Sequence, residues 1–253
     1  MSCTKVVGLA LLAGLALPAG ARADETLICN RYITAVPFTI SVRGHYCFAN
    51  DVRTNLSTGN AITILADDVL LDLNGFSLDG TAAGTGTNAN GIFTFDRRHV
   101  TVRNGTVRGF FDGVQLGAGG ARVAGNTVER IRADLNVVGI AVLGLGGGHV
   151  VRDNVVTNSG AAPVERNGIG IAVYGGADVV NNVVTHIVGN FPIGVDVTGG
   201  LQTIINNRVV DSGQRGISCD DLPAGQYLRD NVVVNTPVPY GPSCNMIGTT
   251  NFP

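Results

Sequence analysis

Apolar and polar residues alternate along most of the chain, and glycine or asparagine interrupts the alternation at regular intervals. Between Gly168 and Ile187, two apolar runs of period two flank Gly175-Gly176, and a third short run follows Asn181-Asn182. Period two is typical of strands with one buried face. Paired glycines and paired asparagines are typical of turns. We therefore interpret this stretch as one coil made of three short strands.

The same order of runs and turns recurs along the chain. Copies open with Gly-Ile or Gly-Val, at Gly91, Gly113, Gly139, Gly168, Gly194 and Gly216. They close with Asn-x-Val or Asn-x-Phe, at Asn74, Asn126, Asn154, Asn182, Asn207 and Asn231. With the irregular member Asn104 included, the closing asparagines lie from 22 residues (Asn104 to Asn126) to 30 residues (Asn74 to Asn104) apart. A repeat of this length predicts a solenoid, and the missing leucine pattern and the short period exclude a leucine-rich repeat and a propeller.

The repeat predicts an all-β protein with one elongated domain over residues 61–253. Residues 24–60 lack the repeat but contain short apolar runs separated by Pro37 and Gly44, so we expect them to form an N-terminal β cap over the first coil. Asparagine at the same corner of successive coils can form a hydrogen-bonded ladder that satisfies buried turn backbone groups. The predicted ladder consists of Asn126, Asn154, Asn182, Asn207 and Asn231.

The first residues have the features of a secretory signal peptide. Lys5 precedes an apolar stretch from Val6 to Pro18, and Ala21-Arg22-Ala23 fits a cleavage site. We expect residues 1–23 to be removed and the protein to be secreted or periplasmic, with an uncleaved anchor as the alternative. No later segment is apolar for long enough to span a membrane.

Export implies that cysteines form disulfides, and four cysteines remain after the leader is removed. Four cysteines allow three pairings. The motif Gly-x-Ser-Cys occurs twice, ending once at Cys219 and once at Cys244, and the two copies are one coil apart. Stacking on neighbouring strands would bring these two within bonding distance. We therefore predict the pair Cys219–Cys244 and, by elimination, the pair Cys29–Cys47.

Several short motifs of the sequence resemble those of a known family. They are Ile62-Thr-Ile, Val69-Leu-Leu-Asp-Leu-Asn-Gly75, Val100-Thr-Val-Arg-Asn-Gly105 and the repeated Gly-Ile-x-Val and Asn-x-Val coils. They are similar to those of bacterial secreted parallel β-helix proteins of the pectate-lyase-like superfamily. The resemblance implies a single-stranded right-handed parallel β-helix of about seven to eight coils. It specifies the fold and not the reaction, because the superfamily includes lyases, epimerases, hydrolases and members without an assigned activity.

Candidate chemistry lies on the strand that follows each opening glycine. Its outward positions are Phe93, Gln115, Ala141, Ala172, Asp196 and Ser218, with a second row that includes Leu143, Tyr174, Thr198 and Asp220. Insertions at residues 132–138, 160–167 and 188–192 precede this strand and should wall a groove for an extended ligand. The predicted substrate-binding residues are Tyr174, Glu165, Arg166, Asp196, Asp220 and Asp221.

Within this groove the residue types permit, but do not require, catalysis. Carboxylates at Asp196, Asp220 and Asp221 could hold Ca²⁺. The resemblance implies that a basic residue would take a proton from a uronate, and because Lys5 is the only lysine, the candidates are Arg166 and Arg215, with Asp196 and Asp220 as further catalytic candidates. The function predicted is binding or processing of a polysaccharide, as a lyase or epimerase before a hydrolase. A non-catalytic surface scaffold or adhesion protein remains the alternative.

The low charge of the chain argues against a nucleic-acid partner. Its net charge is −2 and charged residues make up only 14% of it, so we expect no nucleic-acid partner. His45, His149 and His186 lack zinc-ligand spacing. We expect a monomer with a glycan as its partner.

Overall fold

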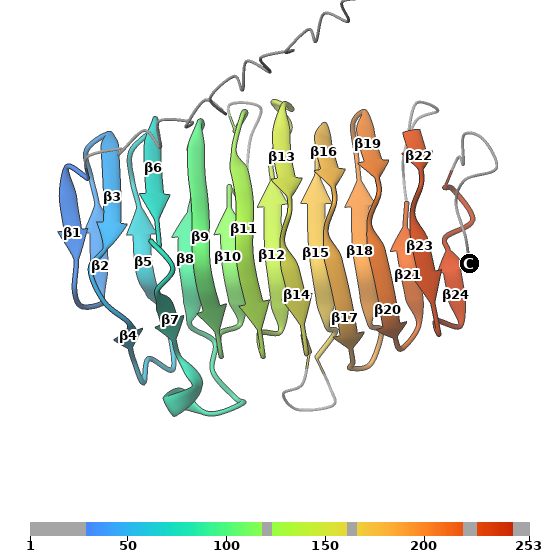
Figure 1. Ribbon diagram of the computed structural model, residues 1–253, viewed down its shortest axis with the longest axis horizontal. Coiled ribbons are helices and arrows are strands. Elements are labelled where there is room, and N and C mark those ends of the chain that lie inside the picture. The colour runs from blue at the N-terminus through green and yellow to red at the C-terminus, as the bar shows by residue number, and fades with distance from the viewer. Residues whose placement is uncertain (1–28, 118–122, 161–165, 220–226, 245–253) are drawn as a thin grey trace, which may run out of the picture.

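The chain forms an elongated stack of coils (Figure 1). The computed structural model describes residues 29–117, 123–160, 166–219 and 227–244. Nearly all regular structure in these residues is β-strand, and the exception is one 3₁₀ turn, η1 (Thr81–Ala83), in the loop before β8. No helix in the described part of the chain is long and apolar enough to cross a membrane.

The described strands form two parallel sheets that run the length of the stack. Sheet B, with one strand from each coil, contains β2 (Phe38–Ile40), β5 (Asn60–Ile64), β8 (Asn90–Thr94), β10 (Asp112–Leu116), β12 (Val138–Leu143), β15 (Ile169–Tyr174), β18 (Ile193–Thr198), β21 (Arg215–Ser218) and β24 (Val238–Tyr240). Sheet A starts with β1 (Arg31–Ile33), β3 (Gly44–Phe48), β6 (Val69–Asp72), β9 (Val100–Arg108), β11 (Thr127–Asp134), β13 (His149–Arg152), β16 (Ala177–Val180), β19 (Gln202–Ile205) and β22 (Tyr227–Arg229). Beyond a bend it continues with β4 (Val52–Arg53), β7 (Ser77–Asp79), β14 (Val155–Thr157), β17 (Val183–Ile187), β20 (Arg208–Ser212) and β23 (Val232–Val234).

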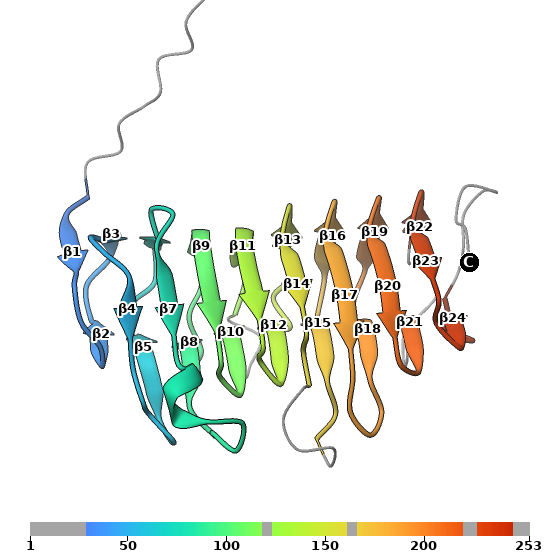
Figure 2. The same cartoon turned by 60° about the horizontal axis from the view of Figure 1, so that its bottom comes forward.

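Each coil therefore passes once through sheet B and then through sheet A, as Figure 2 shows from below. The coil β15-β16-β17 covers the stretch from which the repeat was first identified. Equivalent strands of successive coils pair in parallel, for example Ile171 with Val195. The protein is thus a right-handed parallel β-helix, as predicted.

The N-terminal segment continues the same two sheets. Within it β2 pairs with β5, β3 with β6 and β4 with β7, all in parallel. The expected cap therefore takes the form of the first coil. One predicted insertion was wrong in its extent: Arg132–Asp134 belongs to β11, where it pairs with Val155–Thr157 of β14, so only the residues after Asp134 turn toward β12.

Packing explains the glycine that opens each sheet B strand. A Cβ atom at Gly170 would lie 2.4 Å from Val184 Cγ1 and 2.4 Å from the Gly194 carbonyl oxygen. Gly139, Gly194 and Gly216 meet Val156, Val209 and Val233 in the same way. Only glycine lets the core valine of each coil approach so closely, because contacts this short are not tolerated. In the coil of β15 the equivalent glycine is Gly170, two residues after the predicted Gly168.

Four of the predicted ladder asparagines are hydrogen-bonded in series between the two parts of sheet A. The Asn154 side-chain amide donates to Asn182 Oδ1 (3.0 Å), and the same 3.0 Å contact joins Asn182 to Asn207 and Asn207 to Asn231. Each is at most 1% exposed, and each also donates to a backbone carbonyl of the preceding coil. The ladder therefore satisfies backbone groups that the turns leave buried.

Asn126 was wrongly assigned to this ladder. It lies at a different corner, where its backbone N–H donates to His149 Nδ1 (3.2 Å) and its side-chain oxygen accepts from the Val100 N–H. The ladder position of its own coil is held by Ile131, whose backbone N–H donates to Asn154 Oδ1. The reason is that β11 continues through this corner, so the ladder begins only at Asn154.

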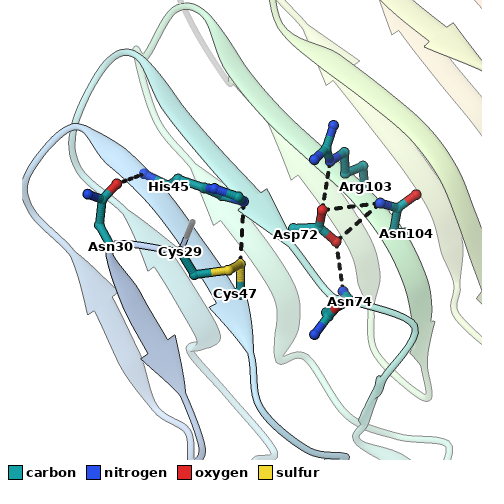
Figure 3. The surroundings of a disulfide bond; sticks show 8 residues. All are labelled: Cys29, Asn30, His45, Cys47, Asp72, Asn74, Arg103 and Asn104. Atoms are coloured by element: carbon teal, nitrogen blue, oxygen red, sulfur yellow. Dashed lines mark hydrogen bonds and ion pairs between the residues drawn. A yellow bond between two sulfur atoms is a disulfide. The ribbon is translucent and has the colours of Figure 1, made fainter. Parts of the chain in front are cut away.

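Both predicted disulfides are present, one at each end of the solenoid. Cys29 and Cys47 have Cα atoms 5.7 Å apart, and Cys219 and Cys244 have Cα atoms 5.1 Å apart. Figure 3 shows His45 beside the first bond, with its Nε2 3.3 Å from Cys47 Sγ. Each bond joins a terminal strand or turn to its neighbour and so restrains the ends, where coils have only one partner.

Candidate functional site

Sheet B carries a straight row of side chains, which we call the long face: Phe93, Gln115, Ala141, Ala172, Asp196 and Ser218. Within this row Ala141 is 4% exposed and Ser218 is fully buried. Strand register places these residues in line, one from each successive coil. The second predicted row, Leu143, Tyr174 and Thr198, is aligned in the same way. Because parallel strands are spaced by about 4.8 Å, the long face repeats at nearly the length of one sugar ring.

The C-terminal half of the long face brings three predicted residues together. Asp196 on β18 pairs with Ser218 on β21, and Arg215 Nη1 donates to Ser218 Oγ at 3.2 Å. Tyr174 is 41% exposed at the end of β15, and its ring covers Gly199, which has a φ of +62°. An aromatic ring, a carboxylate and a guanidinium therefore share this half of the face, a combination that suits a sugar acid.

Three predicted site residues, Glu165, Asp220 and Asp221, lie outside the described residues. Of the carboxylates predicted to hold Ca²⁺, only Asp196 is therefore placed. Ca²⁺ takes six to eight oxygen ligands, and Asp196 belongs to no group of three or more metal-ligating side chains among the described residues. Within the described ranges, the one cluster of metal-ligating side chains is Cys29, His45 and Cys47, whose two sulfurs form a disulfide. These residues alone do not make a calcium site.

Arg166 is placed apart from the other candidates. Its guanidinium donates to the Thr87 carbonyl oxygen (2.8 Å) and to Asn88 Oδ1 (2.8 Å), and it lies over the Phe111 ring at 5.1 Å. These groups precede β8 and β10, on the N-terminal side of β15. Arg166 therefore connects two loops that are far apart in sequence, and Asp196 is not among its contacts.

Sequence reasoning missed a polar group at the other end of this face. Asp112 on β10 immediately precedes Gly113, in register with Val138 of β12. It is 9% exposed and has no hydrogen-bond partner among the described residues, and burial raises its pKa from 3.8 to about 6. Asn90 and Asn60 hold the equivalent positions in earlier coils and are joined by a 2.9 Å hydrogen bond. The sequence feature that could have revealed Asp112 is its charge, because the equivalent position is apolar in the coils of β12, β15 and β18.

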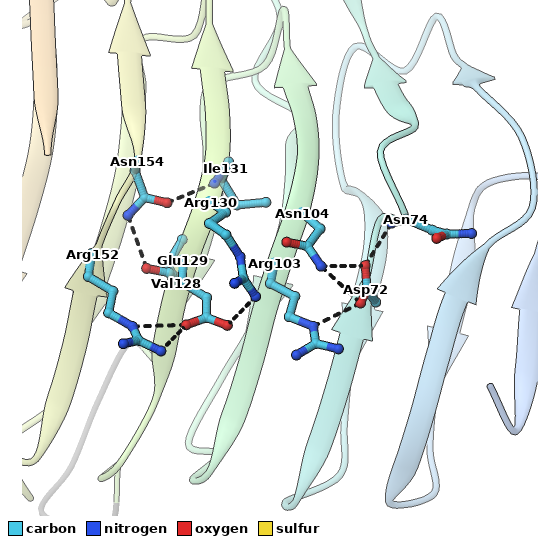
Figure 4. A network of polar contacts seen from close by, with 10 residues as sticks. All are labelled: Asp72, Asn74, Arg103, Asn104, Val128, Glu129, Arg130, Ile131, Arg152 and Asn154. Atoms are coloured by element: carbon cyan, nitrogen blue, oxygen red, sulfur yellow. Dashed lines mark hydrogen bonds and ion pairs between the residues drawn. The ribbon is translucent and has the colours of Figure 1, made fainter. Parts of the chain in front are cut away.

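The outer face of sheet A is built differently. Asp72, Arg103, Glu129 and Arg152 lie in line on β6, β9, β11 and β13. Arg103 Nε contacts Asp72 Oδ2 at 2.8 Å, Arg152 Nε contacts Glu129 Oε2 at 2.9 Å, and Arg130 contacts Glu129 Oε1 at 3.0 Å (Figure 4). Opposite charges alternate here from coil to coil, so these side chains neutralise one another.

Comparison with known proteins identifies the architecture and no more. No protein-family model and no curated protein sequence matches the chain. A crystal structure of the pectate lyase Pel9A matches with a TM-score of 0.54 and 12% identity, over 88% of this chain and 69% of that one. Two weaker matches are the Dettilon tailspike protein (TM-score 0.48, 14% identity, 88% of this chain, 58% of that one) and the A-module of a mannuronan C-5 epimerase from Azotobacter vinelandii (0.36, 12%, 87%, 91%).

The fold and the long face together define the class of protein: a parallel β-helix with an aligned outer strand face. Within that class, the chain is similar in fold to the pectate lyase Pel9A. At 12% identity this similarity concerns the path of the backbone, and the chemistry must be argued from this chain's own side chains.

Proposed function

We propose that this protein binds an extended acidic polysaccharide along the long face, with the chain of sugars running across successive coils. The observation that supports the proposal is the unbroken register from Phe93 to Ser218. A row of side chains with a repeat close to one sugar ring suits a linear glycan better than a compact ligand.

The chemistry of the row supports an acidic sugar as the repeating unit. Tyr174 offers an exposed ring for stacking on a sugar face. Arg215, which donates to Ser218 Oγ, brings a guanidinium to this row, and guanidinium groups form paired hydrogen bonds with carboxylates. Asp196 would accept hydrogen bonds from sugar hydroxyls, or share Ca²⁺ with a uronate if Asp220 or Asp221 completes the ligand set.

Binding without turnover is the second candidate, and one observation favours it. Arg166, one of the two arginines predicted as a base, donates its hydrogen bonds to Thr87 and Asn88. An arginine committed to protein acceptors is poorly placed to take a proton from a substrate. Glycan binding along the long face is therefore the proposed function, and the turnover assay tests whether the glycan is also processed.

We further propose that the protein works outside the cytoplasm. Two disulfides in one chain support this, because cytosolic thiols are kept reduced.

The test uses a panel of uronate polysaccharides with and without Ca²⁺. Binding is measured by affinity electrophoresis, and turnover by the absorbance of unsaturated products and by chain-length analysis. We expect retardation by at least one uronate polymer, and a loss of about tenfold in affinity for Tyr174→Ala and Asp196→Ala. The exposed Tyr32→Ala at the N-terminal end is the matched control. Unchanged affinity in both long-face variants, with folding intact, would refute the proposed site.

A further inference from the structure

A second concave site lies outside the long face, where the loop before β8 faces the corners that precede β10 and β12. Its accessible volume is about 200 Å³. Its lining includes Thr81, Thr85, Thr87, Phe110, Leu135 and Val137. Three separate coils contribute to it, and none of these residues belongs to the long face.

The backbone conformation of Leu135 indicates that its side chain is held at this site at a cost. The residues at the same corner of the other coils are Gly109, Asn158, His186, Asp211 and Asn235, and all have a positive φ. Glycine, asparagine, aspartate and histidine tolerate that region, but a bulky apolar residue there is an outlier. Leu135 has a φ of +56° and is 39% exposed. The corner thus presents an apolar side chain at the mouth of the cavity, where the fold favours asparagine or glycine.

The walls are held in place by contacts that do not involve a ligand. Thr87 Oγ1 donates to the Leu56 carbonyl oxygen (2.9 Å), and the Thr87 carbonyl oxygen accepts from Arg166. Thr81 Oγ1 donates to Asp79 Oδ1 (2.6 Å), and Phe110 is 1% exposed. A cavity whose lining is packed and hydrogen-bonded in this way keeps its shape when empty, which lowers the entropic cost of binding.

The size and polarity of the cavity select the kind of ligand. An apolar cavity of about 150 Å³ in another protein binds benzene, so about 200 Å³ is enough for one aromatic ring with a small substituent. Phe110 and Val137 form a buried apolar wall, and Leu135 adds an apolar edge at the mouth. Thr85 also lines the cavity and is exposed, and no hydrogen bond of its hydroxyl is found among the described residues.

From this geometry we infer a binding site for a single phenol-type aromatic ring, with the ring against Phe110, Leu135 and Val137 and its hydroxyl or ester oxygen toward Thr85. A free phenol and an aromatic group attached to a sugar present the same chemistry to this site, and the probes distinguish the two sources. The site does not depend on glycan binding at the long face, so the two proposals can fail separately.

The experiment compares three probes by ligand-observed NMR with the full-length protein: phenol, phenyl β-glucoside and methyl β-glucoside. For a ligand of this size we expect a Kd of about 0.1 to 1 mM for phenol and no binding of methyl β-glucoside. A phenyl glucoside that binds about tenfold more tightly than phenol would identify the sugar-linked ring as the ligand, and equal affinity would identify the free ring. Absence of binding by both ring compounds would overturn the inference.

The informative variant is Leu135→Asn, because it restores the residue that the next coil has at this corner. It should be at least as stable as the wild type to heat, since asparagine tolerates a positive φ, and it should weaken phenol binding about fivefold or more. Leu145→Asn, at another exposed turn, is the matched control and should leave binding unchanged.

Filling the cavity provides a second, independent test. Val137→Phe should abolish phenol binding, and Thr85→Phe should do the same from the exposed mouth if the first variant does not fold. Phenol affinity that is unchanged in Leu135→Asn and in a folded filling variant would place binding elsewhere and overturn the site.

Discussion

Two buried carboxyl groups on opposite faces of the solenoid differ in almost everything except burial. Glu129 on sheet A is 6% exposed and contacts Arg130 and Arg152. Asp112 on sheet B is 9% exposed and has no such partner in the described part of the chain. A buried charge is normally paired, so Glu129 follows the rule and Asp112 departs from it. Such departures are expected where a residue serves function and not stability, and this one lies in the sheet that carries the long face.

The largest expected effect is a gain of stability in Asp112→Asn. A pKa raised from 3.8 to about 6 means that ionised Asp112 costs the folded state about 3 kcal/mol at pH 7. Asparagine removes the charge at nearly the same volume. We therefore expect a gain of about 1 to 3 kcal/mol in urea unfolding at pH 7, with the exposed Asp178→Asn as control.

The pH dependence of that gain checks its cause. The folded state binds the proton more tightly than the unfolded state, so the wild type keeps its full stability below about pH 4 and loses it as the pH rises to about 6. The advantage of Asp112→Asn should therefore vanish at pH 4. A variant equally stabilised at both values would mean that the buried charge is not the reason.

Glu129→Gln tests the other half of the comparison and should destabilise. The substitution removes the charge from two arginine contacts, of which the arginines are about half exposed, so we expect a loss of about 2 kcal/mol. The exposed pair Arg229 and Asp230 gives the control Asp230→Asn, with an effect below about 0.5 kcal/mol. If Glu129→Gln is neutral, the ion pairs of sheet A do not stabilise the stack.

His149 is a buried titratable group that has partners, and it should act on stability in the opposite direction to Asp112. It is fully buried, accepts from the Asn126 N–H at Nδ1 and donates from Nε2 to the Gly144 carbonyl oxygen. Burial lowers its pKa below 6.5. Its contribution is complete above pH 6.5 and falls as the pH falls, because the unfolded state then binds the extra proton. Unfolding curves of His149→Gln should show less loss of stability between pH 6.5 and 5 than the wild type, and an unchanged slope would contradict this.

The smallest expected effect concerns Arg166. If it only connects the two loops, Arg166→Gln should cost less than about 1 kcal/mol and should speed amide hydrogen exchange in residues 81–90. Glycan affinity should stay unchanged. Lost affinity with unchanged exchange would instead make Arg166 a ligand-binding residue, as first predicted.

The sequence was most informative where the same short motif recurs from coil to coil. Repetition multiplies a weak local signal, so the opening glycines identified the strands of sheet B and the order of the outer row from Phe93 to Ser218. It was least informative where one coil differs. Asn126 has the Asn-x-Val motif that closes the other coils. However, β11 continues past the ladder corner, so Asn126 lies at a different corner, beside His149.

The sequence is enough to deduce which strands of successive coils pair with one another. The reason is that each coil must align its apolar positions, and its cysteines where it has them, with those of the next coil. The sequence by itself therefore determined the solenoid, the order of the row from Phe93 to Ser218 and both disulfides. Only the tertiary structure decided which charges meet across coils, that Arg166 reaches Thr87 and Asn88, and that Leu135 faces a cavity. It also decided that Asp112 is buried with no partner among the residues that the structure describes. The reason is that these features depend on side-chain direction and on contacts between loops of different length, for which a repeat carries no information.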